Sequence, residues 1–272
     1  MALLEIKNLN IVYHGKKQKS EIVQDVSLSV EKGECLCIVG ESGSGKTMTM
    51  KAVMGLLDHT FTINGSAFLN EVDLITADKE TLRKMRGKNM TMIMQNPMVC
   101  FDSLYRIDYQ MAETFKEHTS WNKAEIHEKS VEILRKMQIS DPEEVLKKYP
   151  HQLSGGMLQR IMIGIAISMN PDILIADEPT TAIDSITQYE IMKEFQKLKE
   201  MGITMIFITH DLGVASMISD QIIVMNKGQI VDRGTFESIK NSPKDDYTKA
   251  LVAQKLAVLK AFKQNMGGVL GD

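Results

Sequence analysis

The chain has 272 residues, of which 43% are hydrophobic and 25% charged, and its formal net charge is −3 at pH 7. These values are typical of a globular protein with one large domain or two modest ones, and the charge argues against broad adhesion to nucleic acid. No apolar run approaches the roughly 18–20 residues that span a bilayer. The N-terminus lacks an export pattern, and 3 cysteines make no disulfide framework, so we expect a reducing cytoplasmic location.

The first predicted elements are strands. Residues 4–13 and 22–30 alternate between apolar and polar side chains, which predicts a half-exposed sheet. Residues 35–39 form a short apolar run, which predicts a fully buried strand. A glycine-rich turn then leads into a helix that we expect to end near residue 57. Two more buried strands are predicted at 173–176 and 204–209, with a helix over 184–200 between them.

The middle of the chain has a different character, because it shows helix patterns and few strand signals. Ile126, Ile133 and Leu134 share one predicted helix face, and Asp141 with Pro142 resembles a capped helix start. We therefore predict an α/β fold with a mixed sheet, an N-terminal antiparallel β-subdomain and a helical subdomain inserted at about 96–155. We expect one domain over 1–240, followed by a short helical tail over 241–272.

A phosphate-binding loop is predicted between the buried strand and the first helix. Residues 40–47 read Gly-Glu-Ser-Gly-Ser-Gly-Lys-Thr and match the pattern G-x-x-x-x-G-K-[ST]. Glycines let the backbone wrap around an anion, and the helix N-terminus adds partial positive charge. Lys46 supplies a cation to the terminal phosphates, and the Thr47 hydroxyl is a ligand for Mg²⁺. The alternative is a plain glycine-rich turn.

A second element pairs two carboxylates at the end of an apolar strand. Residues 173–178 read Ile-Leu-Ile-Ala-Asp-Glu. The strand brings Asp177 to the carboxyl edge of the sheet, where ligands of open α/β sheets bind, so we expect it to hold Mg²⁺. Glu178 is then placed to polarise a water aimed at the γ-phosphate. Alone, the pair equally fits a solvated acidic turn.

A third element, Leu153-Ser154-Gly155-Gly156, precedes the acidic pair and makes a second anion-binding helix start. The order of phosphate loop, Gln95, this segment, acidic strand and His210 resembles the nucleotide-binding subunits of ATP-binding-cassette (ABC) transporters. That resemblance covers nearly the whole chain, and it implies a P-loop NTPase (RecA-like) core that binds ATP and Mg²⁺.

The resemblance also implies roles for single residues. Glu178 matches the catalytic base, His210 the switch histidine, and Gln95 a loop that senses Mg²⁺ and the attacking water. Asp177, Thr47 and Gln95 are the implied metal site. The implied nucleotide contacts, shared between two subunits in a head-to-tail dimer, are Tyr13, Gly40, Ser42, Gly43, Ser44, Gly45, Lys46, Thr47, Ser154, Gly155, Gly156 and Asp184. Plainer alternatives are an edge-strand aromatic for Tyr13, a helix-capping histidine for His210 and a simple turn at Gln95.

The sequence is more similar to one branch of the family than to the family in general. Residues 95–98 (Gln-Asn-Pro-Met), 149–153 (Tyr-Pro-His-Gln-Leu) and the Tyr-Thr-Lys-Ala-Leu segment at 247–251 are similar to peptide and nickel importers. The tail differs from that branch, since Asp245-Asp246 replaces its usual His-Pro and the tail is short. Peptides, nickel and metal chelates all stay open as substrates.

The resemblance implies several partners: a second ATPase subunit, two membrane-spanning permease subunits and an extracellular substrate-binding protein. It places the chain peripherally at the cytoplasmic face of the cell membrane, and no nucleic-acid partner is expected. The alternatives are a soluble ABC ATPase for iron–sulfur or other assembly and a ribosome-acting ABC factor. The second usually carries two cassettes, whereas this sequence has one phosphate loop.

Overall fold

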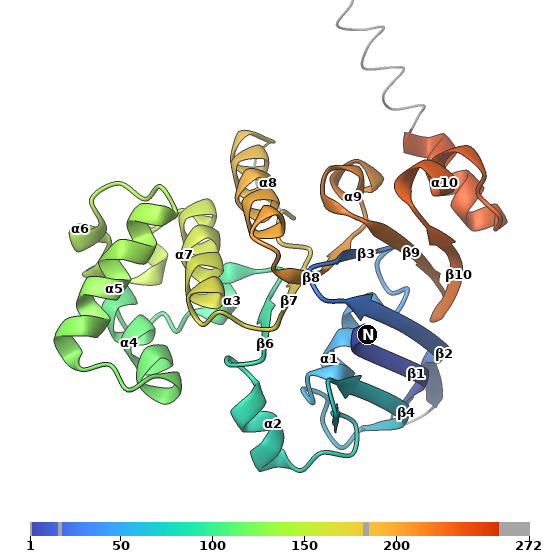
Figure 1. The fold of residues 1–272 in the computed structure, drawn as a ribbon, viewed down its shortest axis with the longest axis horizontal. Helices are drawn as coiled ribbons and strands as arrows, with labels where there is room; N and C mark the ends of the chain where they lie inside the picture. The colour runs from blue at the N-terminus through green and yellow to red at the C-terminus, as the bar shows by residue number, and fades with distance from the viewer. Residues whose placement is uncertain (1, 16–17, 182–184, 256–272) are drawn as a thin grey trace, which may run out of the picture. The chain divides into compact units, whose positions relative to one another are not determined.

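A computed structural model describes residues 2–15, 18–181 and 185–255. The chain divides into two compact units (Figure 1). The discontinuous unit is built from the residues up to Thr76 and from Phe207 onward, and the central unit runs from Ala77 to Ile206. Strand β8 (Thr204–Thr209) begins in the central unit and ends in the discontinuous unit.

An antiparallel sheet forms the N-terminal part of the discontinuous unit (Figure 1). Its strand order is β2-β1-β4-β5, from β1 (Ala2–His14), β2 (Lys19–Glu31), β4 (Phe61–Leu69) and β5 (Val72–Asp73). Ile6 lies opposite Leu28 on one side and Ala67 on the other, and all three are buried. One face of the sheet therefore carries the core, as the alternating pattern predicts.

Irregular backbone interrupts the β1–β2 pair at two polar residues. Asn8 and Asp25 have φ angles of 47° and 50°, and the Asn8 amide donates a 2.7 Å hydrogen bond to the Asp25 carboxylate. Short polar side chains tolerate this left-handed conformation because they bond locally to the backbone and to each other. The register shifts beside them follow from the extra residue that each strand accommodates.

A second sheet in the discontinuous unit positions the glycine-rich loop. Strand β3 (Cys35–Val39) is buried along its whole length and pairs in parallel with β9 (Gln221–Asn226). Strand β9 pairs antiparallel with β10 (Gln229–Gly234), so the sheet is mixed. Helix α1 (Lys46–Val53) follows β3 through the loop. Helices α9 (Leu212–Ile218) and α10 (Phe236–Asn241) follow later, and residues 246–255 are also helical.

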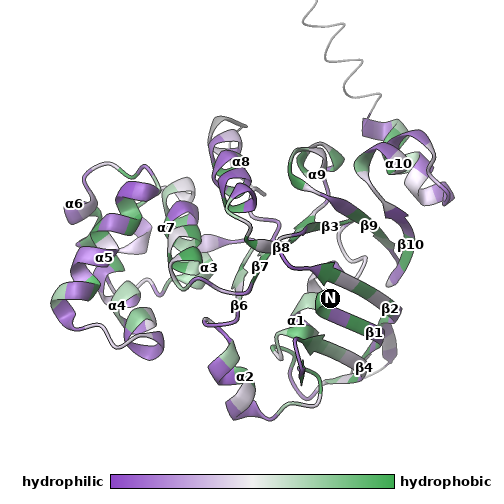
Figure 2. Cartoon of the chain, viewed as in Figure 1, coloured by the Kyte–Doolittle hydropathy of each residue, from purple (hydrophilic) through white to green (hydrophobic). Residues whose placement is uncertain are grey.

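The central unit holds a parallel strand pair. Strand β6 (Met90–Ile93) pairs with β7 (Ile173–Asp177), and β7 is apolar until its last residue and fully buried (Figure 2). Helix α7 (Gly155–Ser168) precedes β7, and helix α8 (Ser185–Glu200) follows it. Buried parallel strands need apolar side chains on both faces, which the sequence supplies.

Short helices fill the segment between β6 and α7. They are α3 (Pro97–Cys100), α4 (Ile107–His118), α5 (Lys123–Lys136), α6 (Pro142–Leu146) and the 3₁₀ turn η1 (Pro150–Gln152). Asn122 caps α5 in a capping box with Glu125. Asp141 occupies the N-cap position of α6 but makes no side-chain cap bond in the described structure, because its backbone is left-handed at φ 49°. The prediction that the Asp141 side chain caps this helix is therefore wrong, although the helix does begin at Pro142.

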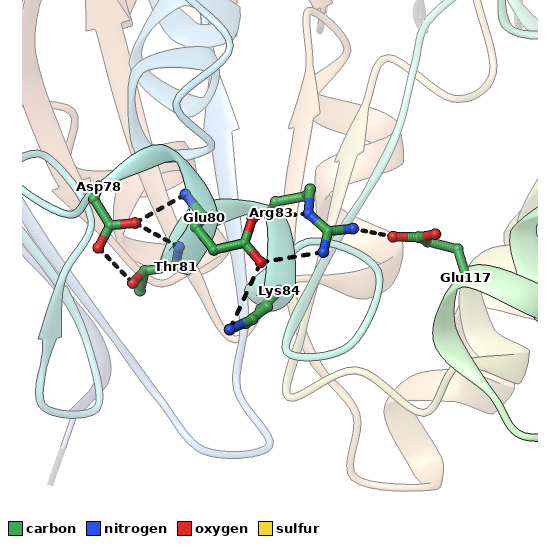
Figure 3. A network of polar contacts seen from close by, with 6 residues as sticks. All are labelled: Asp78, Glu80, Thr81, Arg83, Lys84 and Glu117. Atoms are coloured by element: carbon green, nitrogen blue, oxygen red, sulfur yellow. Dashed lines mark hydrogen bonds and ion pairs between the residues drawn. The ribbon is translucent and has the colours of Figure 1, made fainter.

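Helix α2 (Lys79–Met85) is anchored by a network of charged side chains (Figure 3). Asp78 caps the helix, accepting 2.9 Å hydrogen bonds from the backbone N–H groups of Glu80 and Thr81. The Arg83 guanidinium pairs with Glu80 on its own helix and with Glu117 on α4. The exposed Arg83–Glu117 pair thus joins α2 to α4 within the central unit, and solvent screening keeps the contribution of such a pair to stability small.

The expected α/β class, the mixed sheet and the antiparallel N-terminal sheet are confirmed. The first helix ends at Val53 rather than near 57, because a left-handed glycine at 55 follows its last turn. Strands β4, β5, β9 and β10 and helix α2 were not predicted. The division into a 1–240 domain and a 241–272 tail stays a prediction. Among the described residues, none of the helices is both long and apolar enough to cross a bilayer.

Candidate functional site

The glycine-rich loop begins where β3 ends and closes at the N-terminus of α1. Gly43 and Gly45 have φ angles of 82° and 100°, a region that side chains with a Cβ rarely adopt. Gly45 occupies the N-cap position of α1 and brings no capping side chain. A Cβ at Gly43 would meet no described atom within 4 Å, so the loop backbone is open on this side. A compact anion can therefore approach the backbone closely.

Lys46 is folded back into the loop instead of extending into solvent. Its side chain is buried, and its Nζ donates hydrogen bonds to the carbonyl oxygens of Gly40 (2.7 Å) and Glu41 (2.8 Å). The Ser44 hydroxyl lies 3.4 Å from the same nitrogen. A buried ammonium needs oxygen partners, and carbonyl dipoles hold it here close to where a phosphate would supply full negative charge.

Close backbone packing fixes both ends of the loop. A Cβ at Gly40 would lie 2.2 Å from the carbonyl oxygen of Met225 on β9. A Cβ at Gly45 would lie 3.0 Å from the carbonyl oxygen of Ile22 on β2. The first position excludes any side chain, and the second leaves little room for one. Glycine is therefore required at these points both for conformation and for space.

The hairpin turn between β9 and β10 supports the same loop. Gly228, with φ 81°, donates its N–H to the Ser44 carbonyl at 3.1 Å. Its own carbonyl accepts a 2.8 Å hydrogen bond from the Gln24 N–H on β2. Lys227 precedes it with φ 47°, so both central residues of the turn are left-handed, as in type I′ hairpins. Strand β2 and the loop are thus joined through one turn.

Tyr13 lies near the end of β1 with its ring partly exposed. It pairs with Phe61 on β4, and the two ring centroids are 5.1 Å apart. This arrangement fixes the ring and keeps part of it open to solvent, which suits stacking on a flat heterocycle. Ser42 is exposed and Thr47 is half-buried at the start of α1.

The acidic pair lies in the central unit at the end of β7. The parallel register places Ile93 opposite Ala176, so the residues after both strands emerge side by side. Asp177 is buried, at 3% exposure, while Glu178 is half-buried with a left-handed backbone at φ 45°. Such a conformation costs about 1–3 kcal/mol for a residue other than glycine and is typical of functional positions.

Two donors hold the Glu178 carboxylate. The Gln95 side-chain amide donates to Glu178 Oε2 at 3.0 Å, and the Thr181 hydroxyl donates to the same oxygen at 2.9 Å. Thr181 also closes a turn, because its N–H donates to the Glu178 carbonyl at 3.1 Å. Gln95 and Glu178, each predicted separately as a site residue, are therefore in contact. Thr181 was not predicted, although a hydroxyl three residues after a carboxylate in a Pro-Thr-Thr turn is a readable signal.

The Ser-Gly-Gly segment forms an exposed helix start. Ser154 caps α7, its hydroxyl oxygen accepting a hydrogen bond from the Met157 N–H at 3.2 Å. A Cβ at Gly155 would meet no atom of the described residues within 4 Å. A Cβ at Gly156 would lie 2.6 Å from Cγ2 of Thr187 on α8. The first glycine therefore faces open space, and the second packs against a neighbouring helix.

His210 follows β8 and is exposed. The next residue, Asp211, caps α9 by accepting the Gly213 N–H at 2.6 Å and also pairs with the Lys255 ammonium at 2.5 Å. Burial acts to raise the pKa of Asp211, but the bonds from Lys255 and Gly213 outweigh it and hold the pKa below its ordinary value. Asp211, not His210, is therefore the capping residue.

The predicted site residues fall into two groups. The discontinuous unit carries Tyr13, the glycine-rich loop and His210, while the central unit carries Gln95, the Ser-Gly-Gly segment, Asp177 and Glu178. Asp184 lies outside the described residues. The buried Lys46, the open backbone at Gly43 and the helix start of α1 fit a polyphosphate. A hydroxyl and a buried carboxylate, from Thr47 and Asp177, are the donor types that Mg²⁺ prefers.

Comparisons with known proteins point the same way. The family model described as "ABC transporter" matches residues 23–181. The chain is 40% identical over 273 residues to the metal-staphylopine import system ATP-binding protein CntD of Staphylococcus aureus, covering 100% of both. It is 42% identical over 254 residues to the dipeptide transport ATP-binding protein DppD of Haemophilus influenzae, covering 93% of this chain and 77% of the relative.

A solved structure is similar in fold. The dimeric ATP-binding cassette MJ0796, in a post-hydrolysis state bound to ADP and Pi, has a TM-score of 0.76 and 27% identity to this chain. The likeness covers 86% of this chain and 98% of that chain. The predicted P-loop NTPase core is thereby confirmed.

Proposed function

Because the chain belongs to the family of ATP-binding subunits of ABC transporters, we propose that its two groups of site residues act on ATP to energise import of a small solute. The chain is an ATPase coupled to transport, of the branch that contains peptide and metal-chelate importers. The observation that carries the residue assignment is the Glu178 carboxylate, which the Gln95 and Thr181 side chains hold in one orientation.

Binding is assigned to the discontinuous unit. The loop from Gly40 to Thr47 cradles the phosphates through backbone N–H groups, and Tyr13 stacks on the adenine. Lys46 exchanges its two carbonyl partners for phosphate oxygens, which is favourable because phosphate oxygens carry full negative charge whereas carbonyl oxygens carry only a partial one. We propose Thr47, Asp177 and Gln95 as the residues that hold Mg²⁺. When bound, Mg²⁺ neutralises phosphate charge and polarises the γ-phosphate.

Hydrolysis is assigned to Glu178 and His210. The Glu178 carboxylate accepts a proton from the attacking water, and its two donors keep it aimed while it does so. His210 orients the water and the γ-phosphate from the end of β8. The left-handed backbone at Glu178 is consistent with this role, because strained conformations are retained where the site requires them.

A second ATPase subunit completes the site in this proposal. Gly155 lies at an exposed helix start with open space above it, so it can receive an anion held by another chain. Ser154, Gly155 and Gly156 are assigned to the γ-phosphate bound by the partner, and Asp184 to the same seam. The similar cassette whose structure is a dimer with ADP and Pi supports this arrangement.

The membrane partner is proposed to dock on the central unit. A cleft of about 490 Å³ there is lined mainly by apolar and aromatic residues, among them Met92, Cys100, Phe101, Tyr105, Met162 and Ile165. Val99 and Leu104 are 80% and 77% exposed in the segment that follows Gln95. Exposed apolar clusters of this kind mark protein interfaces. We assign the cleft to a cytoplasmic segment of one of the two permease subunits, and this assignment puts the chain at the cytoplasmic face of the membrane.

The solute is proposed to be a metal chelate delivered by an extracellular binding protein. The metal-staphylopine relative matches this chain over its full length, whereas the chain spans 77% of the dipeptide relative. Binding of a metal–chelator complex, but not of dipeptides, by the binding protein of the same complex is the expected result.

Two variants test the residue assignment. Glu178→Gln removes the proton acceptor, so ATP turnover in the assembled complex is expected to fall by at least about a hundredfold while ATP binding persists. Lys46→Ala removes the phosphate cation, and ATP affinity of the purified chain is expected to fall by at least about tenfold. Near-normal hydrolysis by Glu178→Gln would remove it from the base role. Unchanged affinity in Lys46→Ala would refute the phosphate loop.

A further inference from the structure

The segment that follows α10 is seated firmly on the discontinuous unit. Asp245 begins the helix over residues 246–255, because its side chain accepts the Tyr247 N–H at 2.8 Å and its carbonyl accepts the Lys249 N–H at 3.0 Å. Thr248 is fully buried, and Val252 is 8% exposed. A segment held in this way has a fixed position relative to the loop on which it packs.

Tyr247 reaches the phosphate loop from this helix. Its hydroxyl oxygen accepts a hydrogen bond from the Glu41 backbone N–H at 2.9 Å. That N–H belongs to the peptide group whose carbonyl oxygen, on Gly40, accepts the Lys46 ammonium at 2.7 Å. Because a peptide group is planar, fixing its N–H also fixes its carbonyl. One peptide plane is therefore held on one side by Tyr247 and on the other by the phosphate-binding lysine.

The last described residue of the same helix, Lys255, contacts the residue after His210. The Lys255 ammonium lies 2.5 Å from Asp211 Oδ1, the carboxylate oxygen that caps α9. Lys255 also lies over Gly213, where an added Cβ would meet its Nζ at 3.0 Å. The described part of this helix thus contacts the phosphate loop through Tyr247 and the start of α9 through Lys255.

We infer that the segment over residues 243–255 is a brace for the nucleotide site, with Tyr247 as a positioning residue for the phosphate loop and Lys255 as one for His210. The inference rests on the proposed roles of the loop and of His210. When ATP draws Lys46 away from the Gly40 carbonyl, the Tyr247 bond keeps the peptide plane in place. Burial raises the pKa of Tyr247, so its hydroxyl stays neutral at physiological pH.

The decisive variant is Tyr247→Phe, which keeps the ring and removes only the hydroxyl group that accepts the Glu41 N–H. We expect its ATP dissociation constant to rise by about threefold to tenfold, the range that one hydrogen bond supplies. In the assembled complex KM for ATP should rise by a similar factor while kcat stays within about twofold. Lys255→Gln should do the reverse, lowering kcat by about threefold and leaving KM within about twofold, because His210 acts on the reacting phosphate.

The matched control is Lys249→Gln on the same helix. Lys249 pairs only at the surface with Asp246, so both kinetic constants should stay at wild-type values. The split between KM and kcat is the readout that a purely structural role does not move, and amide hydrogen exchange in the full-length chain reports whether Tyr247 protects the loop backbone. The Glu41 amide should exchange faster in Tyr247→Phe than in wild type, while the melting temperature without nucleotide is unchanged.

Several results would overturn the brace. Wild-type KM and Glu41 exchange in Tyr247→Phe would refute it, and so would a weaker affinity fully accounted for by a lower melting temperature without nucleotide. Lys46→Ala keeps the two proposals apart. If Lys46→Ala loses affinity while Tyr247→Phe does not, only the brace fails; if Lys46→Ala binds normally, the phosphate-loop assignment fails first.

Discussion

The substitution Gly155→Ala at the start of α7 should leave the stability of the chain intact while it slows ATP hydrolysis. Gly155 is the first residue of this helix, and an added Cβ would meet no described atom within 4 Å. Alanine also restricts the unfolded chain more than glycine does, which stabilises a compatible helix by up to about 1 kcal/mol. In the first turn we expect about half of that value, which raises Tm by about 1–2 °C.

Gly156 offers the contrasting substitution. An alanine Cβ there would lie 2.6 Å from the Thr187 γ-methyl, so one of the two groups must move. Overpacking of this size costs about 1–3 kcal/mol, and Gly156→Ala should lower Tm by about 2–10 °C. Thr187→Ser removes the γ-methyl and should restore most of the lost stability in the double variant. The pair therefore measures a steric contact that is independent of nucleotide.

Activity provides the second half of the test. If Gly155 receives the phosphate held by a partner subunit, a methyl group there occupies the space that the phosphate needs. Gly155→Ala should then hydrolyse ATP at least about tenfold more slowly in the assembled complex, although the chain melts no lower and binds ATP alone as wild type does. Steady-state phosphate release and thermal denaturation provide the measurements. A stable Gly155→Ala complex with a wild-type rate would refute the shared-site reasoning.

Two further predictions concern the Gly228 turn, which supports the phosphate loop, and the Asp211–Lys255 pair at the start of α9. In Gly228→Ala, where φ is 81°, the added Cβ would lie 2.5 Å from the Ile22 carbonyl oxygen, so we expect the free energy of unfolding to fall by about 2–4 kcal/mol. The control is Gly202→Ala, where φ is 78° and no described atom lies within 4 Å, so the loss should be only about 1 kcal/mol. Equal losses of the two variants in thermal denaturation would contradict the steric argument. The Lys255 bond and the Gly213 N–H hold the pKa of Asp211 below its unfolded value, so this pair stabilises the fold above about pH 4 and its contribution disappears as pH falls through the folded pKa. The Tm difference between wild type and Lys255→Gln should therefore be constant from pH 8 to pH 5 and shrink in stronger acid, and a difference that shrinks already at pH 6 would argue against the pair.

The sequence could predict the parts of this site that depend on local pattern. The buried strand before Gly40, the loop itself and the apolar strand that ends at Asp177 are short, contiguous signals, and each depends only on neighbouring residues. The resemblance implied separate roles for Gln95 and Glu178, whereas their hydrogen bond is a finding of the structure that the parallel register of β6 and β7 explains.

The remaining parts depend on contacts between distant segments. Strand β9 has a readable apolar run followed by Asn-Lys-Gly, but its role as a support for Gly40 appears only when the strands are in place. The bond from Glu41 to Tyr247 joins residues 206 positions apart, and no local pattern encodes it. Asp141 was misjudged because an aspartate before a proline fits a capped helix start, whereas its own backbone turned left-handed.

The order of synthesis gives the Gly228 turn a further consequence. The phosphate loop leaves the ribosome early, but Met225, Gly228 and Tyr247, which hold its backbone, are made near the end of translation. Contacts of such long sequence separation form slowly, because a large part of the chain must be ordered to close them. A nascent chain that stops before residue 225 should therefore contain every residue of the phosphate-binding motif and still lack a formed nucleotide pocket.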